Sequence, residues 1–319
     1  MAGGQERILR GRIRSIQSTK KITRAFELIA ASRIVRAQNA IAAARPYVEK
    51  MSEVVGHLAQ TPDARTHPLF RRPDDVRRVA IVAVAGDRGL SGAYNSSVIR
   101  ATERAARDHR DAGREVVLVA VGRKVGGYFR YRNQPVSESF TGMADRPTVE
   151  DARRVSDPVV AAFVAGEVDQ IDLVYTYFES LGRQRVQVRT LVPVEPPRPA
   201  DPPPADPGSA RPDGFVVDYE YEPDPAELLD RLLPSWLQGE IFAALLSASA
   251  SEYAARQRAM KAATDNADDL ITNLTRVMNR ARQEAITTEI MEIVGGAEAL
   301  RAGGDDQPNY RDTYVDGAA

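Results

Sequence analysis

The sequence has 319 residues, of which 43% are apolar and 27% charged, and its formal net charge is −1. It contains no cysteine and only three scattered histidines, which excludes disulfides, thiolate catalysis and Cys-type zinc sites. We therefore expect no metal and no other cofactor. A net charge so close to zero gives no general attraction to nucleic acid. A charged partner must therefore be inferred from an uneven distribution of charge along the chain.

No segment has the composition of a membrane span or a secretion signal. The most apolar stretch, residues 241–250, already contains serines and is far shorter than the roughly 20 residues that a bilayer requires. The start, MAGGQERILR, lacks the apolar core of a signal peptide. These features predict a cytoplasmic protein with no direct membrane span.

Residues 1–60 are predicted to form one helix of a coiled coil. From residue 30 onward the apolar residues alternate spacings of four and three, which is the heptad seam of a coiled coil. Pro46 falls inside this pattern without changing its phase, so we expect it to bend the helix rather than end it. The seam consists of Ala30, Ile34, Ala37, Ile41, Ala44, Val48, Met51, Val55 and Leu58.

Residues 75–194 are predicted to form a central α/β domain. Buried apolar runs start at residues 79 and 115, and two longer runs, 168–180 and 183–194, form a pair joined at Leu181-Gly182. Helical patterns at residues 96–110 and 148–165 lie between them. Strands that alternate with helices indicate a mostly parallel sheet with helices on its faces.

The loop GDRGLSG after the first strand leaves two interpretations open. Its glycines, Gly86, Gly89 and Gly92, are spaced GxxGxxG. This spacing matches neither the dinucleotide-binding fingerprint GxGxxG nor the phosphate loop GxxxxGK(S/T). We favour a tight strand-to-helix turn that needs glycine geometry, with Asp87 and Arg88 as loop-fixing or surface residues. The alternative is a nucleotide-binding α/β enzyme with helical arms.

Two segments are too polar to bury a core. Residues 195–214, EPPRPADPPPADPGSARPDG, are predicted to form a mobile, semi-rigid Pro-rich loop. Residues 301–319 are predicted to form a disordered tail.

Residues 219–300 are predicted to supply the second helix of the coiled coil. The stretch from residue 235 to 300 has no proline, and as a single helix it would span about 100 Å, whereas the central domain is about 40 Å across. We expect the helix to project, unless an unmarked loop near Gly239 or residues 247–251 folds it back. The expected seam is Met260, Ala263, Ala267, Leu270, Leu274, Val277 and Ala281.

The two ends of the chain are complementary in charge and in pattern. Residues 1–60 have a net charge of +7, and residues 226–300 have a net charge of −4. One helix enters the central domain and the other leaves it, so two arms that pair side by side must be antiparallel. The C-terminal arm is the longer one, and its tip should extend past its partner.

Four stretches carry a resemblance to a known family, the gamma subunit of bacterial rotary (F-type) ATP synthases. The resemblance covers nearly the whole chain except the Pro-rich loop and the last 19 residues. The stretches are GRIRSIQSTKKITRAFELIAASRIVRAQ (residues 11–38), AGDRGLSGAYN (85–95), YEYEPDPAELLDRLLP (219–234) and SEYAARQRAMKAATDNADDLITNLTRVMNRARQEAITTEIMEIVGGAEAL (251–300).

The resemblance implies a long antiparallel coiled coil of the N- and C-terminal helices and a central Rossmann-like α/β domain. It implies a non-catalytic central-stalk rotor of a proton-translocating ATP synthase, turning inside a ring of alpha and beta subunits. It also implies that the α/β domain lies at the foot of the helical shaft, and that this foot rests on the c-ring beside the epsilon subunit. Such a chain would be peripheral, on the cytoplasmic face of the plasma membrane, with no nucleic-acid partner.

The resemblance also implies three groups of subunit-contact residues. A polar catch that hydrogen-bonds the ring matches Arg282, Gln283 and Thr287. Basic positions near the neck, facing acidic loops of the beta subunits, match Arg33, Arg36 and Arg256. The foot's contact with c-ring loops matches Tyr219, Glu220, Tyr221 and Glu222.

Plainer interpretations of these residues remain open. The catch could be a solvated helix face, and the foot residues could be an exposed turn before Pro223. Two residues depart from the family pattern, since Arg33 replaces the usual lysine and Phe26 replaces a flexible methionine by a rigid aromatic. A different class of protein, a basic coiled-coil scaffold for nucleic acid, would require the charges of the first helix to stay free.

Overall fold

The computed structural model describes residues 2–65, 67–73, 75–194 and 222–304, which fall into two compact units. The first unit combines residues 1–23 with 262–319, and the second contains residues 24–261. Two long helices, α1 (Ala2–Leu58) and α5 (Pro225–Gly304), contribute to both units.

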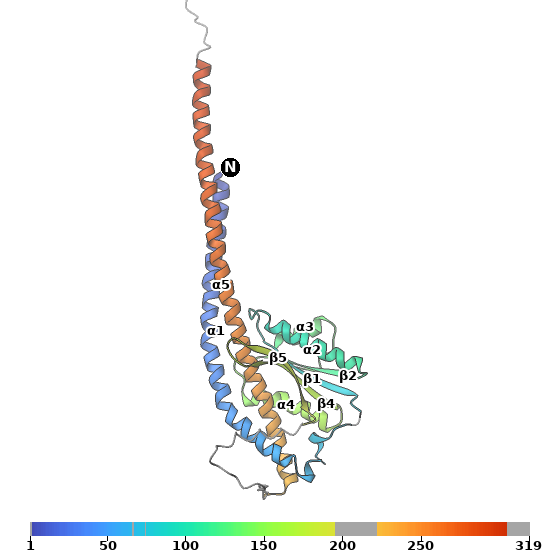
Figure 1. Ribbon diagram of the computed structural model, residues 1–319. Helices are drawn as coiled ribbons and strands as arrows, with labels where there is room; N and C mark the ends of the chain where they lie inside the picture. Colours follow the sequence, from blue (N-terminus) through green and yellow to red (C-terminus); the bar gives the residue numbers. More distant parts are fainter. Residues whose placement is uncertain (1, 66, 74, 195–221, 305–319) are drawn as a thin grey trace, which may run out of the picture. The chain divides into compact units, whose positions relative to one another are not determined.

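In the first unit, the N-terminal part of α1 and the C-terminal part of α5 pack side by side (Figure 1). Lys20 forms an ion pair with Asp268, and the Oγ1 atoms of Thr23 and Thr264 are 2.7 Å apart. Rising numbers on one helix meet falling numbers on the other, so the pair is antiparallel, as predicted.

The seam of α5 differs from the predicted one at two positions, Leu270 and Val277. Leu270 and Val277 are half exposed, at 51% and 50%, whereas their neighbours Ile271 and Met278 are turned inward. The prediction was wrong there because two apolar residues stand next to each other at both places. The polar residue that would have fixed the phase, Thr264, is itself buried in the seam. From residue 262 onward, the buried or partly buried positions of α5 are Ala263, Thr264, Ala267, Ile271, Leu274, Thr275, Met278, Ala281 and Ala285.

Beyond this seam, α5 continues without a partner from α1. Every described side chain from residue 286 to 301 is exposed, including those of Ile293 and Leu300. This confirms that the C-terminal arm extends past the N-terminal one. The helix ends at Gly304, so residues 301–304 belong to it rather than to the predicted tail, and residues 305–319 lie outside the described residues.

In the second unit, α1 and α5 are unbroken where the sequence contains possible interruptions. Helix α1 runs through Pro46 as predicted, and every residue of its predicted seam is buried or partly buried. Helix α5 runs through Gly239 and through the serines of residues 247–251, so the predicted alternative of a fold-back loop is wrong. The serines bind the sheet instead: Ser247 Oγ accepts from the N–H of Phe178 (2.7 Å), and Ser251 Oγ donates to the carbonyl of Thr176 (3.2 Å).

The second unit also contains a five-stranded sheet in the order β3-β2-β1-β4-β5. The strands β1 to β4 are mutually parallel and β5 is antiparallel to β4, which confirms the predicted mostly parallel sheet and its closing pair. The short strand β3 was missed. The strands are β1 (Arg78–Val84), β2 (Glu115–Val121), β3 (Glu138–Phe140), β4 (Gln170–Phe178) and β5 (Gln184–Val192).

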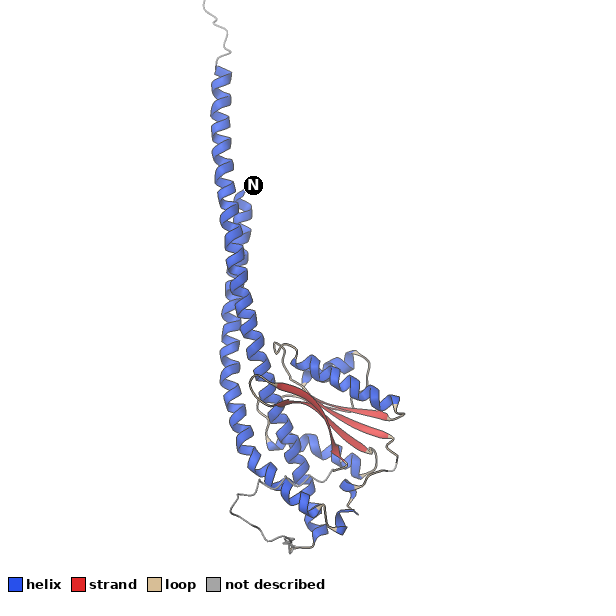
Figure 2. Cartoon of the chain, viewed as in Figure 1, coloured by secondary structure: helices blue, strands red, loops and turns tan. Residues whose placement is uncertain are grey.

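Helices cover both faces of this sheet (Figure 2). Val79, Ile81 and Ala83 pack with α2 and α3 on one face, while alternate residues of β1 pack with α4 and α5 on the other, because strand side chains alternate. Helix α3 was not predicted, since its nine residues include two glycines. The helices are α2 (Tyr94–Asp111), α3 (Arg123–Tyr131) and α4 (Val149–Val164), with 3-10 turns η1 (Pro62–Arg65) and η2 (Pro68–Phe70).

A membrane-spanning helix is absent from the described part of the chain: none of its helices has the combination of length and hydropathy that crossing a bilayer requires.

Candidate contact surfaces

The glycine-rich loop after β1 is fixed by one asparagine of α2. Asn95 Oδ1 accepts from the N–H of Gly86 (2.8 Å), and its Nδ2 donates to the carbonyl of Arg88 (3.1 Å). A Cβ atom on Gly86 would lie only 2.7 Å from the carboxyl group of Glu252 on α5. Glycine is therefore required for close approach between loop and helix, which supports the favoured interpretation of a tight turn.

The charged residues of this loop also act within the chain. The carboxylate of Asp87 accepts from the N–H groups of Arg123 (3.0 Å) and Gly142 (2.9 Å), so Asp87 fixes the loop as predicted. The guanidinium of Arg88, 70% exposed, is 3.5 Å from Asp145. The loop thus joins the ends of β1, β2 and β3 to one another.

Arg256, predicted to face a partner, is 8% exposed. Its guanidinium pairs with Glu252 one turn earlier on α5 and donates to the carbonyl of Gly89 (3.3 Å). Burial raises the pKa of Glu252, and the charge and hydrogen bond of Arg256 oppose that rise. Arg256 therefore holds the glycine loop against α5 and leaves little surface for another subunit.

Arg33 lies in a closed triangle with Asp145 and Tyr253. It donates to Asp145 Oδ2 (2.9 Å) and to the hydroxyl of Tyr253 (2.7 Å), and that hydroxyl donates to Asp145 Oδ1 (2.7 Å). Burial alone would raise the pKa of Asp145, but the hydrogen bonds from Tyr253 and Arg33 and the charge of Arg88 hold that pKa below its usual value. The hydrogen bonds to Tyr253 and Asp145 raise the pKa of Arg33.

The ring of Tyr253 is the shared surface of two predicted contact residues. The guanidinium carbons of Arg33 and Arg256 lie 5.5 and 5.4 Å from its centroid, within the range of a cation–π interaction. The ring joins α1, α5 and the loop of Asp145 into one network.

Arg36 is exposed and lies beside a cavity of about 250 Å³. The cavity is also lined by Arg33, Asp145 and Arg146, so three guanidinium groups face one carboxylate there. Arg36 Nη2 is 3.5 Å from Ser32 Oγ, at the limit of a hydrogen bond. The excess of positive charge makes this cavity suited to an acidic side chain.

Arg282, Gln283 and Thr287, the predicted catch, are all exposed on α5 in the first unit. Thr287 Oγ1 donates to the carbonyl of Gln283 (3.0 Å), a bond internal to the helix. Among the residues described, neither the Arg282 nor the Gln283 side chain forms a hydrogen bond or ion pair. Both side chains are therefore available to a partner.

Exposed apolar side chains surround this part of α5. Ile286 is 48% exposed and Met291 68%, and both are outside the seam. A large apolar surface beside unpaired polar groups is typical of a contact surface. The other members of this exposed group are Ile290, Ile293 and Val294.

The predicted foot residues can be followed only in part. Glu222 is exposed just before α5, whereas Tyr219, Glu220 and Tyr221 lie outside the described residues. Sequence reasoning missed Asp145, Glu252 and Tyr253 as members of the neck network. The sequence SEYAARQ contains two of them, but the partner Asp145 is 108 positions from Tyr253 and has no local signal.

Comparison with known proteins places these features in a family. Residues 5–300 match the family model described as "ATP synthase". The chain is 46% identical to the ATP synthase gamma chain of Parafrankia sp. (strain EAN1pec), over 94% of this chain and 99% of that one. It is 44% identical to the ATP synthase gamma chain of Acidothermus cellulolyticus, over 95% of this chain and the full length of that one.

Solved structures share the fold at lower sequence identity. A chain of the Euglena gracilis mitochondrial ATP synthase has a TM-score of 0.62 and 15% identity, with 98% of this chain and 100% of that chain covered. A chain of the central stalk and c-ring structure of the Tetrahymena thermophila mitochondrial ATP synthase has a TM-score of 0.55 and 21% identity, with coverages of 76% and 99%.

Proposed function

The chain belongs to the family of ATP synthase gamma chains, and on that premise we propose that it transmits rotation of the c-ring to the catalytic beta subunits. It is a central-stalk subunit of an F-type ATP synthase and is not catalytic, so the alternative of a nucleotide-binding enzyme is wrong.

The observation that carries the proposal is the exposed end of α5 beyond the seam. An antiparallel helix pair resists bending and twisting better than one helix, and the free end offers a surface on all sides. Apolar side chains such as Ile286 and Met291 would slide against an apolar sleeve without fixed partners. We expect the ring of alpha and beta subunits to supply that sleeve.

The catch is the polar part of this surface. Arg282 and Gln283 would donate hydrogen bonds to the ring, and Thr287 would lie one turn further along the same face. Charge-assisted bonds are the stronger kind and depend on geometry, so they would form at some rotational positions and break at others. Such contacts would couple rotor angle to the state of a beta subunit.

At the neck, the basic cavity would receive an acidic loop of a beta subunit. Arg36 is the exposed donor, and Arg33 would share its charge between Asp145 and the partner. Arg256 would act indirectly by holding the glycine loop and Tyr253 in place. This assigns a direct contact to Arg36 and Arg33 and a positioning role to Arg256.

The foot would meet the membrane sector. Glu222, with Tyr219, Glu220 and Tyr221 before it, would contact loops of the c-ring beside the epsilon subunit. Carboxylates there would suit basic loops. The chain would then be peripheral, on the cytoplasmic face of the plasma membrane.

Single-molecule rotation tests the rotor proposal. The chain has no cysteine, so Arg104→Cys on the exposed side of α2 gives a unique attachment site for a gold rod. With the alpha and beta subunits fixed to a surface, ATP should drive stepwise rotation of the rod. Turnover of ATP in the assembled complex without rotation of the rod would contradict the proposal.

The catch is tested by the double variant Arg282→Ala with Gln283→Ala. Losing the charge-assisted contact should cost about 1.5–3 kcal/mol, so ATP turnover should fall about tenfold or more while the complex still assembles. The helix should survive, because alanine is the best helix former and neither residue lies in the seam. Arg104→Ala is the control, and turnover equal to wild type in the double variant would reject the catch.

A further inference from the structure

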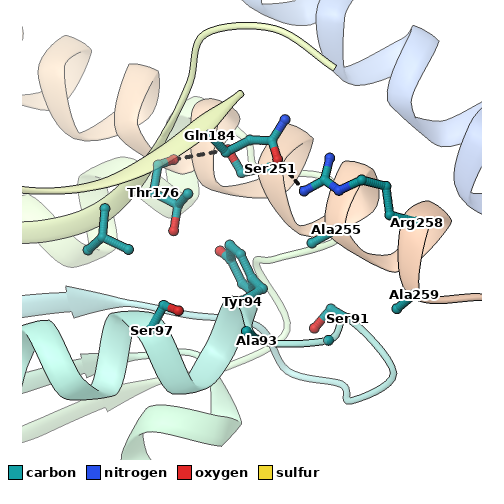
Figure 3. A pocket seen from close by; sticks show the side chains of 12 residues that line it. Ser91, Ala93, Tyr94, Ser97, Thr176, Gln184, Ser251, Ala255, Arg258 and Ala259 are labelled. Carbon is teal, nitrogen blue, oxygen red and sulfur yellow. Dashed lines mark hydrogen bonds between the residues drawn. The ribbon is translucent and has the colours of Figure 1, made fainter. Parts of the chain in front are cut away.

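A cavity of about 460 Å³ opens between the start of α2, the ends of β4 and β5, and α5 (Figure 3). Its walls carry hydroxyl groups and small apolar side chains. The residues used below are Tyr94 and Ser97 of α2, Thr176 of β4, and Ala255, Arg258 and Ala259 of α5.

The cavity lies at the switch point of the sheet, between β1 and β4, where the order in which the chain adds strands reverses. From β1 the chain moves to β2 and β3 on one side, and it then returns across the sheet to β4 on the other side of β1. The loop after β1 leads into α2, and Thr176 is near the carboxyl end of β4. Open α/β sheets bind ligands at the carboxyl ends of the strands, at this switch point.

Thr176 supplies an independent sign of a ligand. The residue is 5% exposed, and its Oγ1 atom is buried with no hydrogen-bond partner among the described residues. Figure 3 shows its side chain on the wall of the cavity, facing the same space as Tyr94 and Ser97. A buried hydroxyl without a hydrogen-bond partner is unfavourable, and an acceptor on a ligand would satisfy it.

The cavity favours a negatively charged group. The N-cap residue of α2, Ala93, forms no side-chain cap, although the N–H groups of Tyr94 and Ser97 donate to the carbonyls of Ser91 (3.2 Å) and Ala93 (2.9 Å). The positive end of the helix dipole therefore has no side-chain acceptor from the N-cap. Burial raises the pKa of Tyr94 well above its usual value, so its hydroxyl keeps its proton and can donate. Of the described residues that line the cavity, Arg258 alone carries a formal charge, and it is positive.

Arg258 is held in place by the closing turn of the β4–β5 pair. It donates to the carbonyl of Leu181 (2.7 Å) and to Gln184 Oε1 (2.5 Å). These are neutral acceptors, so the charge of the guanidinium is not neutralised by them. Its position on the rim would attract an anion to the cavity.

We propose that this cavity binds a small phosphorylated molecule, with the phosphoryl group at the start of α2 near Thr176 and Tyr94. The volume exceeds what a free phosphate ion fills and falls in the range of about 300–1,000 Å³ that small-molecule sites occupy. The rest of the ligand would lie against Ala255 and Ala259. The site is separate from the rotor contacts and would be regulatory, since the subunit is not catalytic.

Methyl NMR of the full chain tests the proposal, because the cavity wall carries methyl groups of Thr176, Ala255 and Ala259. Adenosine monophosphate is the probe, inorganic phosphate the competitor, and adenosine the unphosphorylated control. Saturable shifts of these methyl signals with the monophosphate, reversed by phosphate and absent with adenosine, are expected. The buried Ala152 of α4 is the internal control and should not shift.

Two variants locate the site. Thr176→Val keeps the shape, removes a hydroxyl that has no hydrogen-bond partner within the described part of the chain, and should weaken binding about tenfold with no loss of thermal stability. Arg258→Gln should weaken it similarly, whereas Arg104→Gln, the same change on the exposed side of α2, should not. The proposal is overturned if the monophosphate gives no saturable shift, if adenosine binds equally well, or if Thr176→Val binds like wild type.

Discussion

Thr23 of α1 and Thr264 of α5 share a hydrogen bond in the buried seam of the helix pair, with their Oγ1 atoms 2.7 Å apart. Both residues are less than one-tenth exposed, at 9% and 6%. Thr23 Oγ1 also donates to the carbonyl of Lys20 (3.0 Å). Because a buried hydroxyl needs a partner, the pair favours one register over registers shifted by a heptad.

The first prediction concerns this pair. Thr264→Val should lower the free energy of unfolding by about 1 kcal/mol, while the double change with Thr23→Val should cost little more, because the bond between the two helices is already lost in the single variant. A double-mutant cycle in urea measures the coupling. Thr272→Val, exposed on the same helix, is the control. Additive single effects would show that the hydroxyls do not act as a pair.

The second prediction tests the corrected seam. Ile271→Asp should destabilise the helix pair by about 2 kcal/mol or more, since it places a charge against α1. Leu270→Asp, one position away and 51% exposed, should change the stability of the isolated chain by less than about 0.5 kcal/mol. Thermal unfolding of the two variants gives the comparison, and a larger loss for Leu270→Asp would restore the originally predicted phase.

The third prediction concerns Asp145 and pH. Its pKa is lowered in the folded chain, so the folded state binds fewer protons there than the unfolded chain does. Its stabilisation is present at neutral pH and is lost as pH falls through the unfolded value near about 3.9 and on through the lower folded value. Asp145→Asn should therefore cost about 1 kcal/mol at pH 7 and progressively less below pH 4.

Urea unfolding from pH 7 to pH 3 measures this effect, with the exposed Asp108→Asn of α2 as control. A cost of Asp145→Asn that stays constant down to pH 3 would contradict the assigned ionisation.

The contribution of Glu252 to stability should change with pH in the opposite direction. Burial raises the pKa of Glu252, so its destabilising contribution grows as pH rises.

The fourth prediction uses two glycines of the same domain. Gly86→Ala would place a methyl group 2.7 Å from the Glu252 carboxyl, which Arg256 holds in place, and should cost about 1–3 kcal/mol. Gly127→Ala in α3 meets no atom within 4 Å and should stabilise the chain by about 0.5–1 kcal/mol. Equal melting temperatures for the two variants would show that the loop can move away from α5.

The parts of the fold that the sequence predicted are those with a repeating local signal. The four-three spacing on α1 and the apolar runs of β1 and β2 identified the helix pair and the sheet. The phase of α5 was lost where Leu270 and Ile271 stand together, because apolar residues at both positions satisfy either rhythm. Strand β3 has only three residues and no apolar run of its own.

The candidate contact residues differ in the same way: those with a signal in the local sequence could be predicted, and those without one could not. Arg282 and Gln283 could be proposed because they match a motif of a known family. The triangle of Arg33, Asp145 and Tyr253 could not, since its members come from three segments more than 100 positions apart in sequence. Burial of Arg256 likewise depends on a loop, at Gly89, that only the folded chain brings to it.

The reversed direction of β5 determines where the chain leaves the sheet. Val192 lies opposite Ile171, which lies opposite Ala80. The chain therefore leaves β5 beside the point where it enters β1, at the same ends of the strands. The N–H of Val194 donates to the carbonyl of Leu69 (2.9 Å), joining the incoming and outgoing segments directly.

If the fifth strand of nine residues were parallel instead, it would end at the opposite ends of the strands, about 30 Å away. With its ends adjacent, the α/β fold is instead a cassette inserted between two helices at one point. Domains with neighbouring ends tolerate excision and exchange. Because α5 packs on one face of the sheet, a changed cassette must keep that face, but the rest of it can be enlarged or trimmed over evolution without moving either helix along the other.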